Sequence, residues 1–110
     1  MAAYFVCMYT RLHDKSQIEA YWARAGSTMK GYAVKPMAGY TPFKVLEGGQ
    51  NILAVAMAEF SSMEEGMRWY NSPEYTEVRK LRLAGADFLT LIVEGGFAAA
   101  ADRKAMLDTM

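Results

Sequence analysis

Three short segments of this sequence have the composition of β-strands and are apolar on both faces. They are AYFVCMYTR (residues 3–11), ILAVAMAEF (residues 52–60) and DFLTLIVE (residues 87–94). Aromatic and β-branched residues favour strands, and alternate side chains of a strand point to opposite faces of its sheet. An antiparallel sheet with one face in water carries polar residues on that face. The segments therefore predict a sheet that is covered on both sides.

Helix signals lie between the predicted strands. Asp14 is a plausible N-cap, and Gln17 three residues later completes a capping box. The helix that follows has an apolar stripe at helical spacing, and Gly31 is its stop signal. The stripe consists of Ile18, Tyr21, Trp22, Ala25 and Met29.

The second helical region is predicted in two pieces. Ser61 or Ser62 caps the first piece, which has an inner stripe of Met63, Met67 and Tyr70 and stops at the tripeptide NSP. Ser72 caps the second piece and Pro73 occupies its first position, where a missing N–H costs nothing. We expect this piece to run to about Ala84, with Gly85 as its C-cap.

Residues 32–46 contain Pro36, Gly39 and Pro42. Proline cannot donate a hydrogen bond to a neighbouring strand, so this segment is predicted to be an edge strand or an interrupted hairpin. The order strand, helix, strand, strand, helix, strand predicts a ferredoxin-like α+β fold. Its four-stranded antiparallel sheet has the first and third strands at the centre and helices on one face.

Length and the tail define the domain organisation. The 110 residues fit one domain, which we assign to residues 1–96. Residues 97–110 are an alanine-rich extension, and residues 97–108 are predicted to form a helix that docks on the body or on a partner. No other helical layer is available for the open face of the sheet, so we expect a symmetric homodimer formed through that face.

Charge and residue counts narrow the classes of function. Twelve basic and twelve acidic residues cancel, so we expect neither nucleic acid nor a membrane as a partner. The first residues lack the order of a signal peptide, and their apolar run is too short for a membrane span; we expect a cytoplasmic protein. One cysteine and one histidine predict neither a disulfide nor a metal site, and His13 is misplaced as a haem ligand. We expect no cofactor.

The segment FSSMEEGMRWYNSPEYTEVRKLRLAGADFLTLIVEG (residues 60–95) resembles the bacterial family named domain of unknown function 1330. The N-terminal half is similar in its YFV strand, its helix bearing Tyr21, and VLEG at residues 45–48. The resemblance implies the dimeric α+β barrel superfamily, which includes cofactor-free monooxygenases, isomerases, haem enzymes and plain ligand binders. It therefore implies a fold and dimerisation, not a reaction. The chain departs from the family at residues 30–35, which lack the usual arginine, and in the tail after Phe97.

The candidate site centres on the segment WYNSPEYTEVRKLR (residues 69–82). Tyr75, Val78 and Arg82 share one helix face, and an arginine at the border of an apolar face is costly unless it is paired or used. Arg82 is a candidate clamp for an anion, because its guanidinium binds carboxylates in a bidentate manner. The structural alternative is an ion pair with Glu59, Glu94 or another carboxylate, or favourable placement near the C-terminus of the helix. Trp69 shapes the predicted site or simply fills the core.

Other side chains complete the prediction. Tyr21 is a candidate polar contact for the ligand, and His13 is the candidate general acid or base, a role that histidine side chains often have in proteins. Two hypotheses follow. In the first, a pocket between sheet and helices binds, or transforms without metal or haem, a small organic acid or aromatic molecule. In the second, the protein is a non-catalytic module whose Trp/Tyr/Arg motif only stabilises the fold. The sequence does not decide whether the protein is an enzyme.

Overall fold

The computed structural model describes residues 1–110. Its elements follow the predicted order. They are β1 (Ala3–Leu12), α1 (Lys15–Ala25), the short 3-10 helix η1 (Gly26–Met29), β2 (Val34–Gly39), β3 (Ala54–Phe60), α2 (Met63–Tyr70), α3 (Pro73–Gly85), β4 (Ala86–Glu94) and α4 (Ala100–Leu107).

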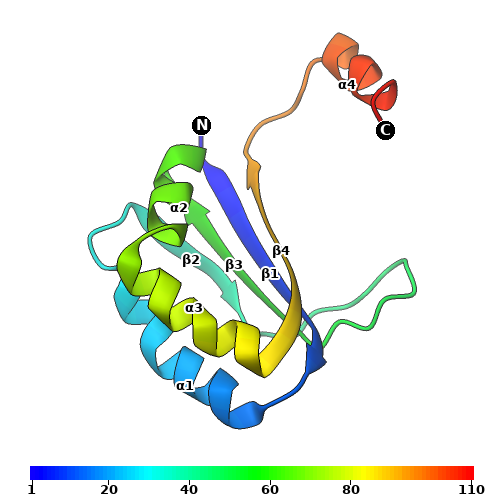
Figure 1. Cartoon of the computed structure of the whole chain (residues 1–110). Helices are drawn as coiled ribbons and strands as arrows, with labels where there is room; N and C mark the ends of the chain where they lie inside the picture. Colours follow the sequence, from blue (N-terminus) through cyan, green and yellow to red (C-terminus); the bar gives the residue numbers. More distant parts are fainter.

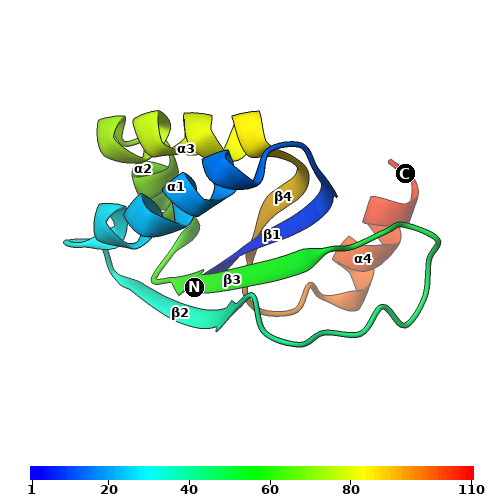
Figure 2. The ribbon, with the colours of Figure 1, turned by 90° about the horizontal axis from the view of Figure 1, so that it is seen from below.

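The four strands form one antiparallel sheet in the order β2-β3-β1-β4. Helices α1, α2 and α3 pack on one face of it, and the other face is open (Figures 1 and 2). The predicted ferredoxin-like α+β fold with β1 and β3 at the centre is confirmed. In the register of the sheet, Cys7 of β1 lies between Ala56 of β3 and Thr90 of β4.

Strand β2 is an edge strand, as its prolines predict. Its pairing with β3 shifts between Pro36 and Ala38. Pro36 has no N–H to donate, so an irregularity at this position costs little.

Serine and aspartate side chains cap the helices as predicted. Ser62 accepts a hydrogen bond from the Glu65 N–H at 3.0 Å, and Ser72 accepts one from the Tyr75 N–H at 3.2 Å. Pro73 stands in the first turn of α3. These caps fix where α2 and α3 begin, which helps to set the directions of the two helices that carry Trp69 and Arg82.

Of the two hydrogen bonds that the predicted capping box between Asp14 and Gln17 requires, the one from the Asp14 N–H to the Gln17 side chain is wrong. The Asp14 side chain caps α1 by accepting from the Ser16 N–H at 2.9 Å. The Asp14 N–H, however, donates to the Gly85 carbonyl at 2.9 Å, so it is not available to a Gln17 side chain. Tertiary contact with α3 replaces the local motif here.

At two glycines the packing differs from the sequence prediction: Gly85 has another role than the predicted C-cap, and Gly66 is buried beside a residue of the predicted inner stripe. Gly85 is the last residue of α3 and not a left-handed C-cap; a Cβ there would lie 2.7 Å from Ile18 Cδ1 and 3.1 Å from the Asp14 carbonyl oxygen. Gly66 is buried on α2, whereas Met67 of the predicted inner stripe is exposed. Both glycines allow close approach between elements.

The open face and the tail remain uncovered in the single chain. Leu89, Leu91 and Val93 of β4 are 51%, 43% and 50% exposed. Helix α4 projects from the end of the sheet (Figure 1) and all its residues are exposed. The prediction that the tail docks on its own body is therefore wrong, and docking on a partner stays a prediction.

Candidate functional site

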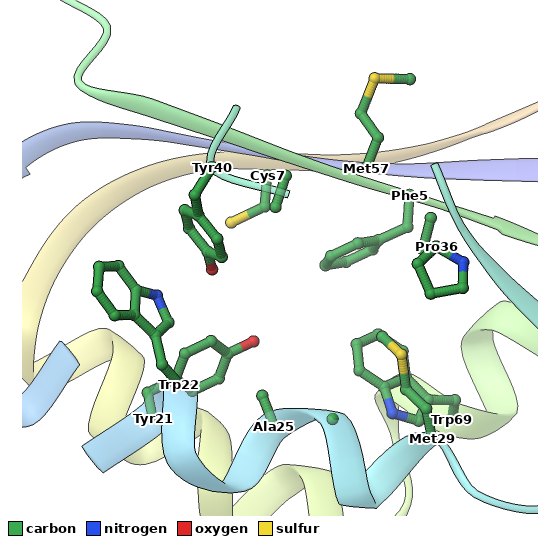
Figure 3. Close-up of a pocket in the computed structure, with 13 residues that line it drawn as sticks. Phe5, Cys7, Tyr21, Trp22, Ala25, Met29, Pro36, Tyr40, Met57 and Trp69 are labelled. Carbon is green, nitrogen blue, oxygen red and sulfur yellow. The ribbon is translucent and has the colours of Figure 1, made fainter. Parts of the chain in front are cut away.

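A cavity of about 520 Å³ lies between α1 with η1 and the helix-covered face of the sheet (Figure 3). Five of the thirteen residues that line it are aromatic. They are Phe5 from β1, Tyr21 and Trp22 from α1, Tyr40 after β2 and Trp69 from α2. Its size is within the range of small-molecule sites, which are mostly apolar with a few placed polar groups.

The polar groups of the cavity gather at one end. Figure 3 shows the hydroxyls of Tyr21 and Tyr40 and the sulfur of Cys7 on one side, and Phe5 with Trp69 on the other. Met29 and Pro36 complete the apolar side. A ligand that matches this lining has an apolar or aromatic body and one polar end.

Tyr40 belongs to a cluster of aromatic groups at the polar end. Its hydroxyl lies 2.8 Å from the Tyr9 hydroxyl, which also accepts a hydrogen bond from Trp22 Nε1 at 3.1 Å. Tyr40 is the only residue other than glycine with a positive φ, at 57°. That conformation is rare for a bulky side chain and is a feature to examine for function.

Tyr21 connects the cavity to a second buried cluster. Its hydroxyl lies 2.8 Å from the Tyr75 hydroxyl. Tyr75 stacks on Trp69 with ring centroids 3.9 Å apart, and Trp69 Nε1 donates to Thr28 Oγ1 at 3.0 Å. Trp69 and Tyr21 thus line the cavity, while Tyr75 lies one layer behind it.

Arg82 also lies behind the cavity and does not line it. Its side chain is 1% exposed. Its Nη1 donates to Thr90 Oγ1 at 3.2 Å and to Cys7 Sγ at 3.6 Å, and its guanidinium stacks over the Phe88 ring at 4.5 Å. Its Nε has no hydrogen-bond partner.

No carboxylate pairs with Arg82. The ion pairs of the chain join His13 to Asp87, Arg68 to Glu65 and Lys80 to Glu77. The predicted ion pair between Arg82 and Glu59, Glu94 or another carboxylate is therefore wrong, whereas Arg82 does lie in the last turn of α3, near the helix C-terminus. The guanidinium remains charged in proteins, so its positive charge is buried beside Cys7 without a counter-ion.

Burial keeps the acidic groups of the site protonated. Desolvation raises the pKa values of Tyr9 and Tyr21 well above the ordinary value of 10.0. It also raises the pKa of Tyr75, against the opposing effect of Arg82, and the pKa of the Cys7 thiol, against Thr90 and Arg82. These groups are hydrogen-bond donors near neutral pH and not bases.

His13 lies apart from this arrangement. Its Nε2 is 2.8 Å from Asp87 Oδ1 on the exposed surface where β1 meets α1, and it does not line the cavity. The structure thus brings Trp69, Tyr21, Tyr75 and Arg82 into one region and places His13 outside it.

Sequence reasoning did not single out Tyr9, Trp22, Tyr40 or Cys7 as site residues. Strand alternation was a usable signal for Cys7 and Tyr9, because both share a face with Phe5. No local signal marks Tyr40, because its side chain enters the cavity through a left-handed backbone that glycine or asparagine would ordinarily adopt.

No three histidine, cysteine, aspartate or glutamate side chains are grouped as metal ligands would be. None of the helices combines the length and the apolar character that a membrane span requires.

Comparison with known proteins identifies relatives of the fold. The family model described as domain of unknown function (DUF1330) matches residues 2–96. A protein of unknown function from Rhodopseudomonas palustris superimposes with a TM-score of 0.66 at 17% identity, covering 88% of this chain and 84% of that chain. No curated protein matches this chain.

Two further solved structures are similar. SnoaB, a cofactor-independent oxygenase from Streptomyces nogalater, has a TM-score of 0.59 at 14% identity over 90% of this chain and 97% of its own. A dimeric ferredoxin-like protein of unknown function from Thermobifida fusca has a TM-score of 0.55 at 13% identity over 86% of this chain and 92% of its own. At these identities the similarity shows a shared fold and not a shared activity.

Proposed function

This chain belongs to the DUF1330 family, and from that premise we propose that its aromatic cavity binds a small organic acid or aromatic molecule. One observation carries the proposal. A cavity of about 520 Å³ is walled by aromatic rings and has its polar groups at one end. The rings of Phe5 and Trp69 offer flat apolar surface to the ligand body, and the hydroxyls of Tyr21 and Tyr40 receive its polar end.

The lining favours binding over catalysis by the chain's own side chains. It contains no histidine and no carboxylate, and the pKa values of Tyr21 and Cys7 are raised by burial. A general base that is ionised near neutral pH is therefore lacking among these groups. The proposal assigns no metal or haem to the cavity. SnoaB supports it only as an analogy, since it is an oxygenase of the same fold that works without a cofactor.

A second candidate function is favoured by the burial of the Trp/Tyr/Arg motif. Trp69, Tyr75 and Arg82 are each at most 1% exposed, which is the burial expected of residues that serve the core. In this alternative the protein is a non-catalytic module and the cavity is a packing defect. The two functions differ in a measurable way, because only the first requires the cavity to accept a ligand.

We also propose that the protein is a homodimer formed through the open sheet face. Val6, Met8, Leu89, Leu91 and Val93 give that face a continuous apolar surface across β1 and β4. Exposed apolar patches of this kind mark interaction sites, and a two-fold symmetric dimer is the commonest solution. The dimeric ferredoxin-like protein from Thermobifida fusca supports this arrangement by its fold.

A cavity-filling substitution tests the ligand-binding proposal. Ala25→Leu places extra atoms in the cavity wall on α1, and Ala84→Leu makes the same change on the exposed surface of α3. Small carboxylates and phenols are screened by thermal shift on the wild type and both variants. We expect ligands that raise the melting temperature of the wild type and of Ala84→Leu but not of Ala25→Leu. Equal responses of all three proteins, or none from any, would contradict cavity binding.

A further inference from the structure

The hydrogen atoms of the cavity's hydroxyls can be assigned by counting donors and acceptors. A phenol has one hydrogen to donate and lone pairs to accept with, while an indole N–H and a guanidinium only donate. A buried hydroxyl hydrogen without an acceptor is costly. In the first of the two hydroxyl clusters these rules leave one arrangement, and in the second they select one together with the positions of the cavity and of Arg82.

The first cluster contains Trp22, Tyr9 and Tyr40. Trp22 Nε1 donates to the Tyr9 oxygen at 3.1 Å. Tyr9 is 3% exposed, and the other partner of its hydroxyl is the Tyr40 hydroxyl at 2.8 Å. The Tyr9 hydrogen therefore goes to the Tyr40 oxygen, since a hydrogen from Tyr40 would leave it without an acceptor. The Tyr40 hydrogen remains unused.

The second cluster contains Tyr75 and Tyr21. Tyr75 is 0% exposed, and its hydroxyl bonds with the Tyr21 hydroxyl at 2.8 Å. If Tyr21 donated this bond, the Tyr75 hydrogen would be buried behind the cavity without an acceptor, whereas Tyr21, although only 7% exposed, lines the cavity and its hydrogen can reach a ligand there. The positive charge of Arg82 opposes the raised pKa of both hydroxyls, and it is a more prominent cause at Tyr75 than at Tyr21; the more acidic hydroxyl is the better donor. Tyr75 therefore donates, and the Tyr21 hydrogen remains unused.

Both unused hydrogens belong to hydroxyls at the polar end of the cavity. Figure 3 shows the Tyr21 and Tyr40 oxygens directed into the same space. Behind them lies the guanidinium of Arg82, which is 1% exposed, has no carboxylate partner and leaves Nε unbonded. Two converging donors with an uncompensated buried cation behind them favour an acceptor that carries negative charge.

We propose that the Tyr21 and Tyr40 hydroxyls form a donor pair for one anionic oxygen on an aromatic ligand, so that the cavity takes phenolates in preference to neutral rings of the same shape. This inference rests on the proposed ligand-binding function and names the chemical class of the ligand. Tyr9, Trp22 and Tyr75 act as positioning residues, because they fix the direction of the two donors. Arg82 contributes its charge from behind Tyr75.

Two probes of matched shape test the inference. Para-nitrophenol becomes yellow on ionisation, and para-nitrotoluene has a methyl group in place of its hydroxyl. The pH at which para-nitrophenol ionises is measured free and bound, and the affinity of para-nitrotoluene is measured beside it. Hydrogen bonds to a charged oxygen should make the phenolate bind roughly tenfold to a hundredfold tighter than the neutral phenol, which lowers the ionisation pH of the bound probe by about one to two units.

Three variants identify the donors. Tyr21→Phe and Tyr40→Phe each remove one donor and should each cancel a large part of the shift while leaving para-nitrotoluene affinity unchanged. Tyr40 is 44% exposed, so its variant stays informative if Tyr21→Phe fails to fold. Tyr70→Phe removes a hydroxyl outside the cavity and should keep the full shift.

The possible results distinguish the donor pair from the ligand-binding function on which it rests. A lowered ionisation pH that depends on Tyr21 and Tyr40 supports the donor pair. Equal binding of both probes with no shift overturns the donor pair and leaves the cavity a ligand site. Failure of both probes to bind overturns the inference together with the proposed function.

Discussion

Arg82 is a guanidinium buried without an opposite charge. It donates to Thr90 and Cys7 and stacks on Phe88, yet its Nε is unbonded. Removing a charge from water costs several kcal/mol unless partners compensate for it. Two neutral partners compensate only in part. The residue therefore lowers the stability of the ligand-free protein and contributes positive charge to the site behind Tyr75.

Substitution of Arg82 separates the two proposed functions. Arg82→Met keeps an unbranched apolar stem and removes the charge, so we expect the free energy of unfolding to stay constant or rise by about 1–3 kcal/mol. Arg79→Met on the same helix removes a half-buried arginine that stacks on Tyr70 and serves as the control. Urea denaturation measures both. A clear loss of stability in Arg82→Met alone would favour the structural module.

Contact between α1 and α3 depends on a glycine at the end of α3. Gly85 allows its carbonyl to accept from the N–H groups of His13 at 2.8 Å and Asp14 at 2.9 Å. Its missing Cβ leaves room for Ile18 Cδ1. This junction positions the start of α1, and α1 in turn carries Tyr21 to the cavity.

Two glycines at opposite ends of this region make a matched pair. A Cβ at Gly85 would lie 3.1 Å from the Asp14 carbonyl oxygen, whereas a Cβ at Gly26 meets nothing within 4 Å, and Gly26 has helical dihedral angles. We expect Gly85→Ala to destabilise the protein by about 1–3 kcal/mol and Gly26→Ala to stabilise it by about 0.5–1 kcal/mol. Chemical denaturation measures both. Stabilisation by Gly85→Ala would refute the close approach.

The whole molecule presents an open apolar sheet face, and the dimer proposal depends on it. Leu91→Lys places a charge in the middle of that face, opposite Val6, while Leu83→Lys makes the same change on the helical side, where Leu83 is 59% exposed. Sedimentation velocity should report a dimer for the wild type and Leu83→Lys and a monomer for Leu91→Lys. A monomeric wild type at micromolar concentration would contradict the dimer proposal.

Most of the fold was predictable because its signals are local. Strand alternation, serine caps and proline positions each act within a few residues, and they gave the element order and the central strands correctly. Close approaches at Gly66 and Gly85 were not predictable, because they depend on side chains such as Ile92 and Ile18 from distant elements.

The candidate site was predictable only in part, for the same reason. Trp69, Tyr75 and Arg82 lie on neighbouring turns of the chain and could be grouped from sequence. Tyr9 and Tyr40 come together through the pairing of strands and a left-handed backbone at Tyr40. The unbonded Nε of Arg82 is a property of the packed core, which no local pattern reveals.

A crystal structure of the protein grown with para-nitrophenol tests the central claim most directly, because it locates the ligand and its oxygen in one measurement. We predict the ring against Phe5 and Trp69, which are in edge-to-face contact with each other, with the phenolate oxygen within hydrogen-bonding distance of both the Tyr21 and Tyr40 hydroxyls. An empty cavity at saturating para-nitrophenol, or a probe whose oxygen points toward the apolar end, would contradict the account.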